Sequence, residues 1–580
     1  MKRKIKRAVA TGMSLAMGTV IMTSDVMVSP VMASQINGEK PYAVELYAAS
    51  NASYNGLYYS TSGSYATITG YDGQSTDIVI PDKIGSYTVN AIQYGAFKDN
   101  NKITSVKIPS TVTQIGNSYG SGAFENCANL KSVSIAAGAE TAYIGNATFK
   151  DCTSLEEITV PGNYTTIYSD AFRGCRSLKK FVYNDNGISR KIQNRAFYEC
   201  TSLVSLSLPT SLNSIGDEAF SGCSSLTAVD IPEGVKLIEY GVFNNCKLLK
   251  KVVIPSTIQR IGNSYNTGAF QNCTSLSTVT IKEGTQAATI GSNTFSGCSA
   301  ITSIVIPGNY SNVMDSAFKD CKGLKTLTYS PSINGITHKI GSYVFENCQS
   351  LAQVTLGTGL ESIDTKAFYN DSMIAEVNIP VGVKSIGQEA FSNCTRLSKL
   401  TLPEGLTVIK SGAFASCKSL KSVVIPSTVT RVTDSYVAGA FENCTGLTSV
   451  TFKEGIAEAV IGQDSFNGCQ SLLSVIIPGN YGKIGDSAFR NCTSLKSFKY
   501  AQSVNNIEHT VGSSAFRDCK SLTSITLEKG LKTIDSYAFC NTNVDKIDIP
   551  EGVTQIVAAS FKDCKNLASV NIPSTVSSIG

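Results

Sequence analysis

Apolar residues recur along this chain in one fixed order, with polar residues between them. A single copy, residues 200–223, reads CTSLVSLSLPTSLNSIGDEAFSGC, and close copies run from Phe97 to Phe561. No copy can bury its apolar positions alone, so neighbouring copies must stack on one another. The pattern therefore predicts a solenoid of about twenty turns. Its anchoring phenylalanines, spaced 22 to 27 residues apart, are Phe97, Phe124, Phe149, Phe172, Phe197, Phe220, Phe243, Phe270, Phe295, Phe318, Phe345, Phe368, Phe391, Phe414, Phe441, Phe466, Phe489, Phe516, Phe539 and Phe561.

Two segments of each copy predict its local structure. In LxxVxI, apolar and polar residues alternate as in a strand with one buried face, which predicts one short parallel strand per turn. The following VxxIG segment buries its own Val and Ile, and its glycine permits a bend. The AF pair then begins a short helical or irregular return. The expected fold is a β-rich α/β solenoid.

The ends of the chain differ from the repeated part. Five basic residues precede an apolar run at residues 8–22, and small residues at 31–33 offer a cleavage site, so residues 1–33 are predicted to be a secretory signal peptide. A membrane anchor is the alternative, which the short, interrupted run disfavours. Residues 34–76 are expected to form a leader and an N-terminal cap with strands near 57–59 and 65–69. Residues 77–580 are expected to form the solenoid, and because the sequence stops within a copy, we expect the natural chain to continue.

A longer period overlies the short one. The tetrapeptide Pro-Gly-Asn-Tyr occurs at residues 161–164, 307–310 and 478–481, each time after a Gly-Ala-Phe that begins at 122, 268 or 439. Blocks of six or seven copies have therefore been duplicated, and equivalent positions of the blocks can be compared.

The net charge of the chain does not indicate a nucleic-acid partner. The formal net charge is +5, but without residues 1–33 the chain keeps 44 basic and 43 acidic residues, a net charge of +1. Nucleic-acid binding needs a concentrated basic surface, which this distribution disfavours.

Eighteen cysteines in an exported chain would ordinarily suggest disulfides. Seventeen of them, however, stand three residues after an anchoring Phe, and the exception is Cys540. They are expected to stack as one row of buried, reduced thiols, because parallel side chains in register do not suit disulfide geometry. Linkage between successive turns is the alternative. One thiol per turn also provides no tetrahedral metal cluster.

Other candidate chemistry is sparse. The two histidines, His338 and His509, occupy equivalent positions seven residues before an anchoring Phe, where the first block has Arg190. We interpret them as polar loop residues. Residues 184–187, Asn-Asp-Asn-Gly, lack the spaced carboxylates of a calcium loop and are expected to form a turn. No paired carboxylates or phosphate-binding loop stand out, so we predict no catalytic residue, no cofactor and no metal site, and no enzymatic activity.

The repeated phrase AFxxCxxLxxVxIPxxVxxIGxxAF resembles the BspA-type, or Treponema pallidum-type, leucine-rich repeat of secreted and surface proteins, over about residues 77–580. The resemblance implies a horseshoe whose LxxVxI strands line the concave face, and adhesion to host or bacterial proteins. It carries over no catalytic residue. The asparagine ladder of common leucine-rich repeats is absent, since small residues such as Ser211 hold that position.

The outward positions of the predicted strands are the candidate binding residues. They are broadly hydrogen-bonding, with apolar residues in some turns that are candidate contact points. The simpler explanation is that Thr and Val merely suit strands. We predict a secreted or cell-surface protein that binds an extracellular protein or other macromolecule along this face; the alternative is a stalk that displays a further domain. The predicted face comprises Lys180, Lys251, Val253, Thr280, Val305, Thr328, Thr355, Lys399, Thr401, Val424 and Ile476.

Overall fold

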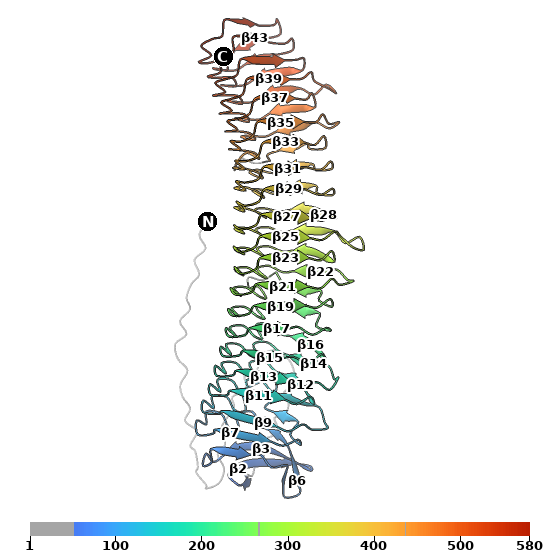
Figure 1. Ribbon diagram of the computed structural model, residues 1–580, viewed down its shortest axis with the longest axis vertical. Helices are drawn as coiled ribbons and strands as arrows, with labels where there is room; N and C mark the ends of the chain where they lie inside the picture. The colour runs from blue at the N-terminus through green and yellow to red at the C-terminus, as the bar shows by residue number, and fades with distance from the viewer. Residues whose placement is uncertain (1–51, 265–266, 435–436) are drawn as a thin grey trace, which may run out of the picture. The chain divides into compact units, whose positions relative to one another are not determined.

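The structure is a computed structural model that describes residues 52–264, 267–434 and 437–580. The predicted signal peptide at residues 1–33 and the first part of the predicted leader lie outside these ranges. Figure 1 shows the turns following one another in chain order, from β7 near the N-terminal end of the described chain to β43 near its other end. The chain is therefore a β-solenoid, as the repeat predicts.

The LxxVxI segment forms the first strand of each turn, as predicted. Its apolar residues point inward and its polar residues outward, as in β11, where the exposed Glu157 and Thr159 alternate with the buried Ile158 and Val160. These strands are β4 (Asp77–Val79), β7 (Ser105–Ile108), β9 (Ser132–Ile135), β11 (Glu157–Val160), β13 (Lys180–Tyr183), β15 (Ser205–Ser207), β17 (Ala228–Asp230), β19 (Lys251–Ile254), β21 (Thr278–Ile281), β23 (Ser303–Ile306), β25 (Thr326–Tyr329), β27 (Gln353–Leu356), β29 (Glu376–Asn378), β31 (Lys399–Thr401), β33 (Ser422–Ile425), β35 (Ser449–Phe452), β37 (Ser474–Ile477), β39 (Ser497–Tyr500), β41 (Ser524–Leu527), β43 (Lys546–Asp548) and β45 (Ser569–Asn571).

The VxxIG segment also forms a strand, which the sequence pattern did not predict as such. Each of these second strands except the last, β46, pairs in parallel with those of the turns before and after it. A buried Ile or Val of each strand lies opposite its equivalent, as Ile215 does with Ile192 and Ile238. They are β8 (Gln114–Ile115), β10 (Ala142–Ile144), β12 (Tyr164–Ile167), β14 (Arg190–Ile192), β16 (Leu212–Ile215), β18 (Leu237–Ile238), β20 (Arg260–Ile261), β22 (Ala288–Ile290), β24 (Tyr310–Val313), β26 (His338–Ile340), β28 (Leu360–Ile363), β30 (Ser385–Ile386), β32 (Val408–Ile409), β34 (Arg431–Val432), β36 (Ala459–Ile461), β38 (Tyr481–Ile484), β40 (His509–Val511), β42 (Leu531–Ile534), β44 (Gln555–Ile556) and β46 (Ser578–Ile579).

The two sets of strands differ in continuity. The second strands form one uninterrupted ladder from β8 to β46, whereas the first strands divide into seven separate sheets. The six interruptions follow β15, β21, β27, β31, β35 and β41. The turns are thus held together along one side and open locally along the other.

The predicted helical return is wrong: the described residues contain no helix, and hence none that could span a membrane. The turn around Phe345 shows why. Tyr343 and Asn347 have φ angles of 60° and 63°, the left-handed region that a helix cannot include. The amides of Tyr343, Phe345 and Asn347 donate to carbonyl groups of the next turn at 2.8–3.0 Å, instead of to carbonyls four residues earlier.

The anchoring phenylalanines fill the interior, as the sequence predicts. All but one of the twenty are fully or almost fully buried, and Phe561 is half-buried. Successive rings stack nearly parallel, as Phe318 does between Phe295 and Phe345 with centroids 5.1 and 5.3 Å apart. Each ring therefore packs on the turns before and after it, which couples neighbouring turns through the core.

Four strands at the start of the described chain lie outside the repeat: β1 (Ala52–Tyr54), β2 (Leu57–Ser62), β3 (Tyr65–Tyr71) and β5 (Lys83–Ile84). The next strand, β6 (Tyr87–Ile92), is the second strand of the first turn, and its Ile92 lies opposite Ile115 of β8. The antiparallel strands β1, β2 and β3 join the solenoid through β6, which pairs in parallel with both β3 and β8. The expected strands near 57–59 and 65–69 correspond to β2 and β3. These strands thus cover the first edge of the uninterrupted ladder.

Candidate interaction surface

The outward side chains of the first strands, from β7 to β45, form what we call the outer face. Parallel pairing in register places equivalent positions beside one another, as for Lys180 and Ser205, or Thr328 and Thr355. The predicted binding residues all lie on this face, which brings them onto one surface of the stacked turns. Those with exposed side chains are Lys180, Lys251, Thr280, Val305, Thr355, Lys399, Thr401, Val424 and Ile476, whereas Val253 and Thr328 are half-buried.

Apolar side chains on the outer face are exposed to an unusual degree. Val305, Val424 and Ile476 are 53%, 46% and 60% exposed, and each stands at the central outward position of its strand. Most other turns have Thr, Ser or a charged residue there. The face thus offers separate apolar contact points within a hydrogen-bonding surface.

Charged residues on the outer face are partly paired with each other. Lys399 lies 3.5 Å from Glu376 in the preceding turn, and Lys499 lies 2.7 Å from Glu528 in the following one. Exposed pairs of this kind contribute little to stability, but they remove free charge from the face. Positive charge is left unpaired at particular turns only, and Lys180 and Lys251 are examples.

The sequence pattern did not reveal the six interruptions, which alter the outer face most. Half-buried inward-pointing side chains gather on or just after strands that precede an interruption, with Ile135 in β9 as an exception; they are Leu206, Leu208, Val279, Val354, Leu356, Leu400, Leu402 and Ile525. Five of the six interruptions thus expose part of the apolar core at the outer face, whereas Val450 and Phe452 of β35 stay buried.

The row of seventeen cysteines is structural. All eighteen thiols are free, and each of the seventeen donates a hydrogen bond to the carbonyl of the Phe one turn earlier, as Cys223 Sγ does to Phe197 O at 3.3 Å. Burial raises the pKa of Cys223 and of Cys444 to about 12. Since the thiolate is the reactive form, burial disfavours a nucleophilic role for these two thiols.

The interpretation of the histidines as loop residues is wrong. His338 begins β26 and His509 begins β40, and both side chains are fully buried. Each ring stacks on a buried tyrosine, with centroids 4.5 Å apart for Tyr329 and 4.3 Å for Tyr500. Each Nε2 lies 3.0 Å from the carbonyl oxygen of the Gly in the Pro-Gly-Asn-Tyr loop, while Nδ1 has no hydrogen-bond partner among the described residues.

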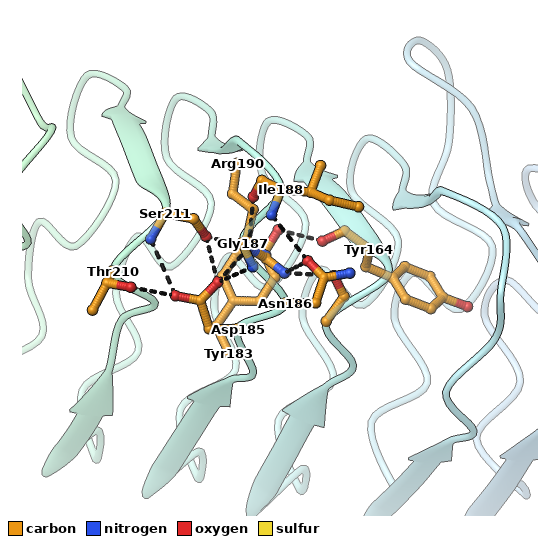
Figure 2. Close-up of polar contacts among 10 residues, drawn as sticks. Tyr164, Tyr183, Asp185, Asn186, Gly187, Ile188, Arg190, Thr210 and Ser211 are labelled. Carbon is orange, nitrogen blue, oxygen red and sulfur yellow. Dashed lines mark hydrogen bonds and ion pairs between the residues drawn. The ribbon is translucent and has the colours of Figure 1, made fainter.

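Arg190 holds the same position in the first block, and Figure 2 shows its contacts. Its guanidinium lies over Tyr183, with 5.5 Å from Cζ to the ring centroid, and donates to Asp185 Oδ1 at 2.9 Å. It also donates to Asn186 Oδ1 and to the carbonyl of Gly162. Hydrogen bonds from the side chains of Thr210 and Ser211 lower the pKa of Asp185. The Asn-Asp-Asn-Gly segment therefore pairs with a buried arginine and serves as structure.

A catalytic or metal-binding arrangement has no counterpart in these contacts. Across residues 52–264, 267–434 and 437–580, no group of three His, Cys, Asp or Glu side chains is placed to hold a metal ion. The buried histidine and arginine side chains contact main-chain carbonyls and neighbouring tyrosines, and the cysteines contact carbonyls.

Comparison with known proteins identifies the repeat. The family model described as the BspA type leucine rich repeat region (6 copies) matches residues 71–190, 263–340, 326–439, 437–511 and 508–580, which is more than half of the chain. The chain belongs to the BspA-type leucine-rich repeat family. No curated protein matches this BspA-type chain in sequence.

Several solved structures are similar to this BspA-type chain. A leucine-rich repeat protein from Bacteroides ovatus is 25% identical with a TM-score of 0.47, over 77% of this chain and 94% of that one. A leucine rich cell surface protein from Faecalibacterium prausnitzii is 26% identical with a TM-score of 0.30, over 78% and 95%. A leucine rich repeat protein from Treponema pallidum is 23% identical with a TM-score of 0.25, over 43% and 90%.

Proposed function

We propose that this BspA-type chain is a non-enzymatic, exported protein that binds another extracellular protein through the outer face. The observation that carries the proposal is the exposure of Val305, Val424 and Ile476 at equivalent outward positions of a surface that is otherwise hydrogen-bonding. Exposed apolar residues that recur at equivalent positions of one surface are candidate contact points for a protein partner.

Membership of the BspA-type family supports a binding role, because repeat arrays of this kind present extended surfaces to ligands. Export is supported by the pattern of residues 1–33, which lie outside the described residues. We also propose that β1, β2 and β3 cap the first turn, since they extend the uninterrupted ladder with antiparallel strands.

The test measures binding of residues 34–580 to a panel of purified extracellular matrix proteins and intact bacterial surfaces by biolayer interferometry and flow cytometry. The key variant carries Val305→Asp, Val424→Asp and Ile476→Asp together. Burying an apolar side chain contributes about 1.5–3 kcal/mol when it is fully exposed beforehand. We therefore expect the triple variant to lose about tenfold or more in affinity for whichever partner binds.

A matched control changes the other side of each turn. Lys191, Lys339 and Lys483 are exposed, equivalent residues of the second strands β14, β26 and β38. The variant with Asp at these three positions should bind as tightly as the original chain. Equal loss in both variants, or no loss in the first, would show that the outer face is not the binding surface. Absence of binding to any partner would instead favour the alternative, a stalk that displays a further domain.

A further inference from the structure

The interruption between β15 and β17 forms a defined hollow on the outer face. Residues 204–208 and 227–230 line it, and its volume is about 440 Å³. No ladder hydrogen bond joins the two strands, although β16 and β18 of the same turns remain paired through Ile215 and Ile238. An unpaired strand edge presents both amides and carbonyls, so the facing edges of β15 and β17 are left for another partner.

Apolar side chains form part of the otherwise polar lining of the hollow. Leu206 and Leu208 are half-buried, whereas Phe181 at the position equivalent to Leu206 in β13, and Val252 in β19, are fully buried. Val204, at the rim, is 47% exposed. An apolar side chain of a partner could therefore contact core leucines without any change of fold.

Lysines flank the hollow on both sides. Lys180 pairs in register with Ser205 on one wall, and Lys251 pairs in register with Ala228 on the other. Each is preceded by a further exposed lysine, Lys179 or Lys250. Lys180 in β13, the hollow between β15 and β17, and Lys251 in β19 thus follow one another along the outer face.

Three acids lie near these four lysines. Lys179 lies 3.0 Å from Glu156, Glu157 pairs in register with Lys180, and Asp230 stands on the far wall of the hollow. Across residues 52–264, 267–434 and 437–580, Lys180 and Lys251 are part of no ion pair. The surroundings of this hollow therefore carry an excess of positive charge, which complements an acidic ligand.

We propose that this hollow binds an extended acidic segment of a partner protein, with one apolar side chain in contact with Leu206 and Leu208 and carboxylates on either side near Lys180 and Lys251. The main chain of such a segment offers the donors and acceptors that the unpaired strand edges lack. This inference rests on the proposed function and names the partner chemistry at one place on the outer face.

The equivalent interruption in the second block provides an internal contrast. Between β27 and β29 the wall residues are Gln353 and Glu376, and Thr326 holds the position of Lys180. Lys399, equivalent to Lys251, is already paired with Glu376 at 3.5 Å. That interruption lacks the free positive charge, so we expect the acidic segment to bind at the hollow between β15 and β17 and not between β27 and β29.

The test uses the whole chain from residue 34 and a synthetic fluorescent peptide with a central leucine and two glutamates on each side. Fluorescence anisotropy should show binding that weakens as ionic strength rises from about 0.05 to about 0.3 M. The variant Lys180→Ser with Lys251→Ser should lose about fivefold or more in affinity. A peptide with serine in place of leucine should also bind more weakly, whereas Lys399→Ser, the control, should change nothing.

Three results would overturn the proposal: no binding of the acidic peptide, equal binding of a peptide with lysines in place of glutamates, or an effect of Lys399→Ser as large as that of the double variant. These outcomes can be distinguished from a failure of the proposed function. If the triple outer-face variant loses its protein partner while the peptide fails to bind, the outer face is still the binding surface, but the acidic subsite is refuted. Circular dichroism of each serine variant checks that the fold is intact.

Discussion

Asp371 offers the sharpest quantitative test of the core. It occupies the position of the cysteine row in its turn, three residues after Phe368, and its side chain is fully buried. Neither carboxylate oxygen has a hydrogen-bond partner among the residues that the structure describes. Burial raises the pKa of Asp371 well above its usual value, and Glu346 adds to the shift. We therefore expect a neutral carboxyl, able to donate to the carbonyl of Phe345 as the cysteines on either side donate to Phe318 and Phe368.

Keeping this carboxyl neutral has a calculable cost. In the unfolded chain an aspartate has a pKa of about 3.9, so holding it protonated in the folded chain at pH 7 costs about 4 kcal/mol, at about 1.4 kcal/mol per pH unit. Because the folded state binds the extra proton, stability falls as pH rises above about 4 and continues to fall up to the folded pKa. Asp371→Cys removes this loss. The variant should be more stable than the original by up to about 4 kcal/mol at pH 7, and nearly equal to it near pH 4.

Amide hydrogen exchange over residues 366–394 measures this effect locally, which suits a repeat protein whose turns unfold in part independently. Urea unfolding at the two pH values gives the overall change. Asp230→Asn, at an exposed position, is the control and should show no such pH dependence. If Asp371→Cys destabilises the chain at pH 7, or shifts it equally at both pH values, then Asp371 is a charged and satisfied group, and the reasoning from burial fails.

Three further predictions follow from the core. Burial lowers the pKa of His338 and His509, so the unfolded chain is protonated first and stability is lost as pH falls below about 6.5. This loss of stability should appear as faster amide exchange within β26 as the pH falls, and His338→Gln should abolish the increase. An unchanged increase would show that another group causes it. In the row of seventeen cysteines, only Cys564 is not fully buried. A thiol reagent should therefore modify Cys564 first in the native chain, and all eighteen cysteines after denaturation. Mass spectrometry of the modified chain distinguishes free thiols from disulfides. Phe318→Ala should cost about 3–5 kcal/mol, seen as faster exchange in the adjacent turns and unchanged exchange near β2.

The repeated positions of the fold could be predicted because each is defined many times. Twenty copies fix the apolar alternation of the first strand, the stacked phenylalanines and the row of cysteines, so one unusual turn does not obscure them. The returns could not be predicted as reliably. The residue before each cysteine of the row is Asn, Asp, Gly, Ser or Glu. Asn347 and Asp320 are two of these residues, and both have φ angles in the left-handed region. That preference is a signal against a helix which the AF pair alone does not give.

The buried histidines were missed for a different reason. A histidine in a polar segment between two strands is ordinarily exposed, and here only the tertiary arrangement buries it. The block comparison did contain a hint, because Arg190 replaces histidine at the same position and both side chains reach the Gly carbonyl of the Pro-Gly-Asn-Tyr loop. A long polar side chain that donates to this carbonyl is thus what the position requires.

The interruptions of the first sheets have a partial signature in the sequence. At the three equivalent ones, a Leu ends or directly follows the strand before the gap, as at Leu208, Leu356 and Leu527. The strand after the gap has Asp or Asn at its central outward position. Leu is less suited to strands than β-branched residues, and Asp and Asn are depleted in them. Pairing is therefore weakest where two poor strand formers meet.

This weakness links the core to the outer face. The second strands and the stacked phenylalanines hold every turn in place, so the first strands can separate locally without loss of the fold. What each gap offers then depends on its own wall residues, with lysines free beside β15 and β17 and a lysine paired to Glu376 beside β29. Duplication of the blocks has thus kept the openings at equivalent places while their charges have diverged, which allows one solenoid to present different contact sites along its length.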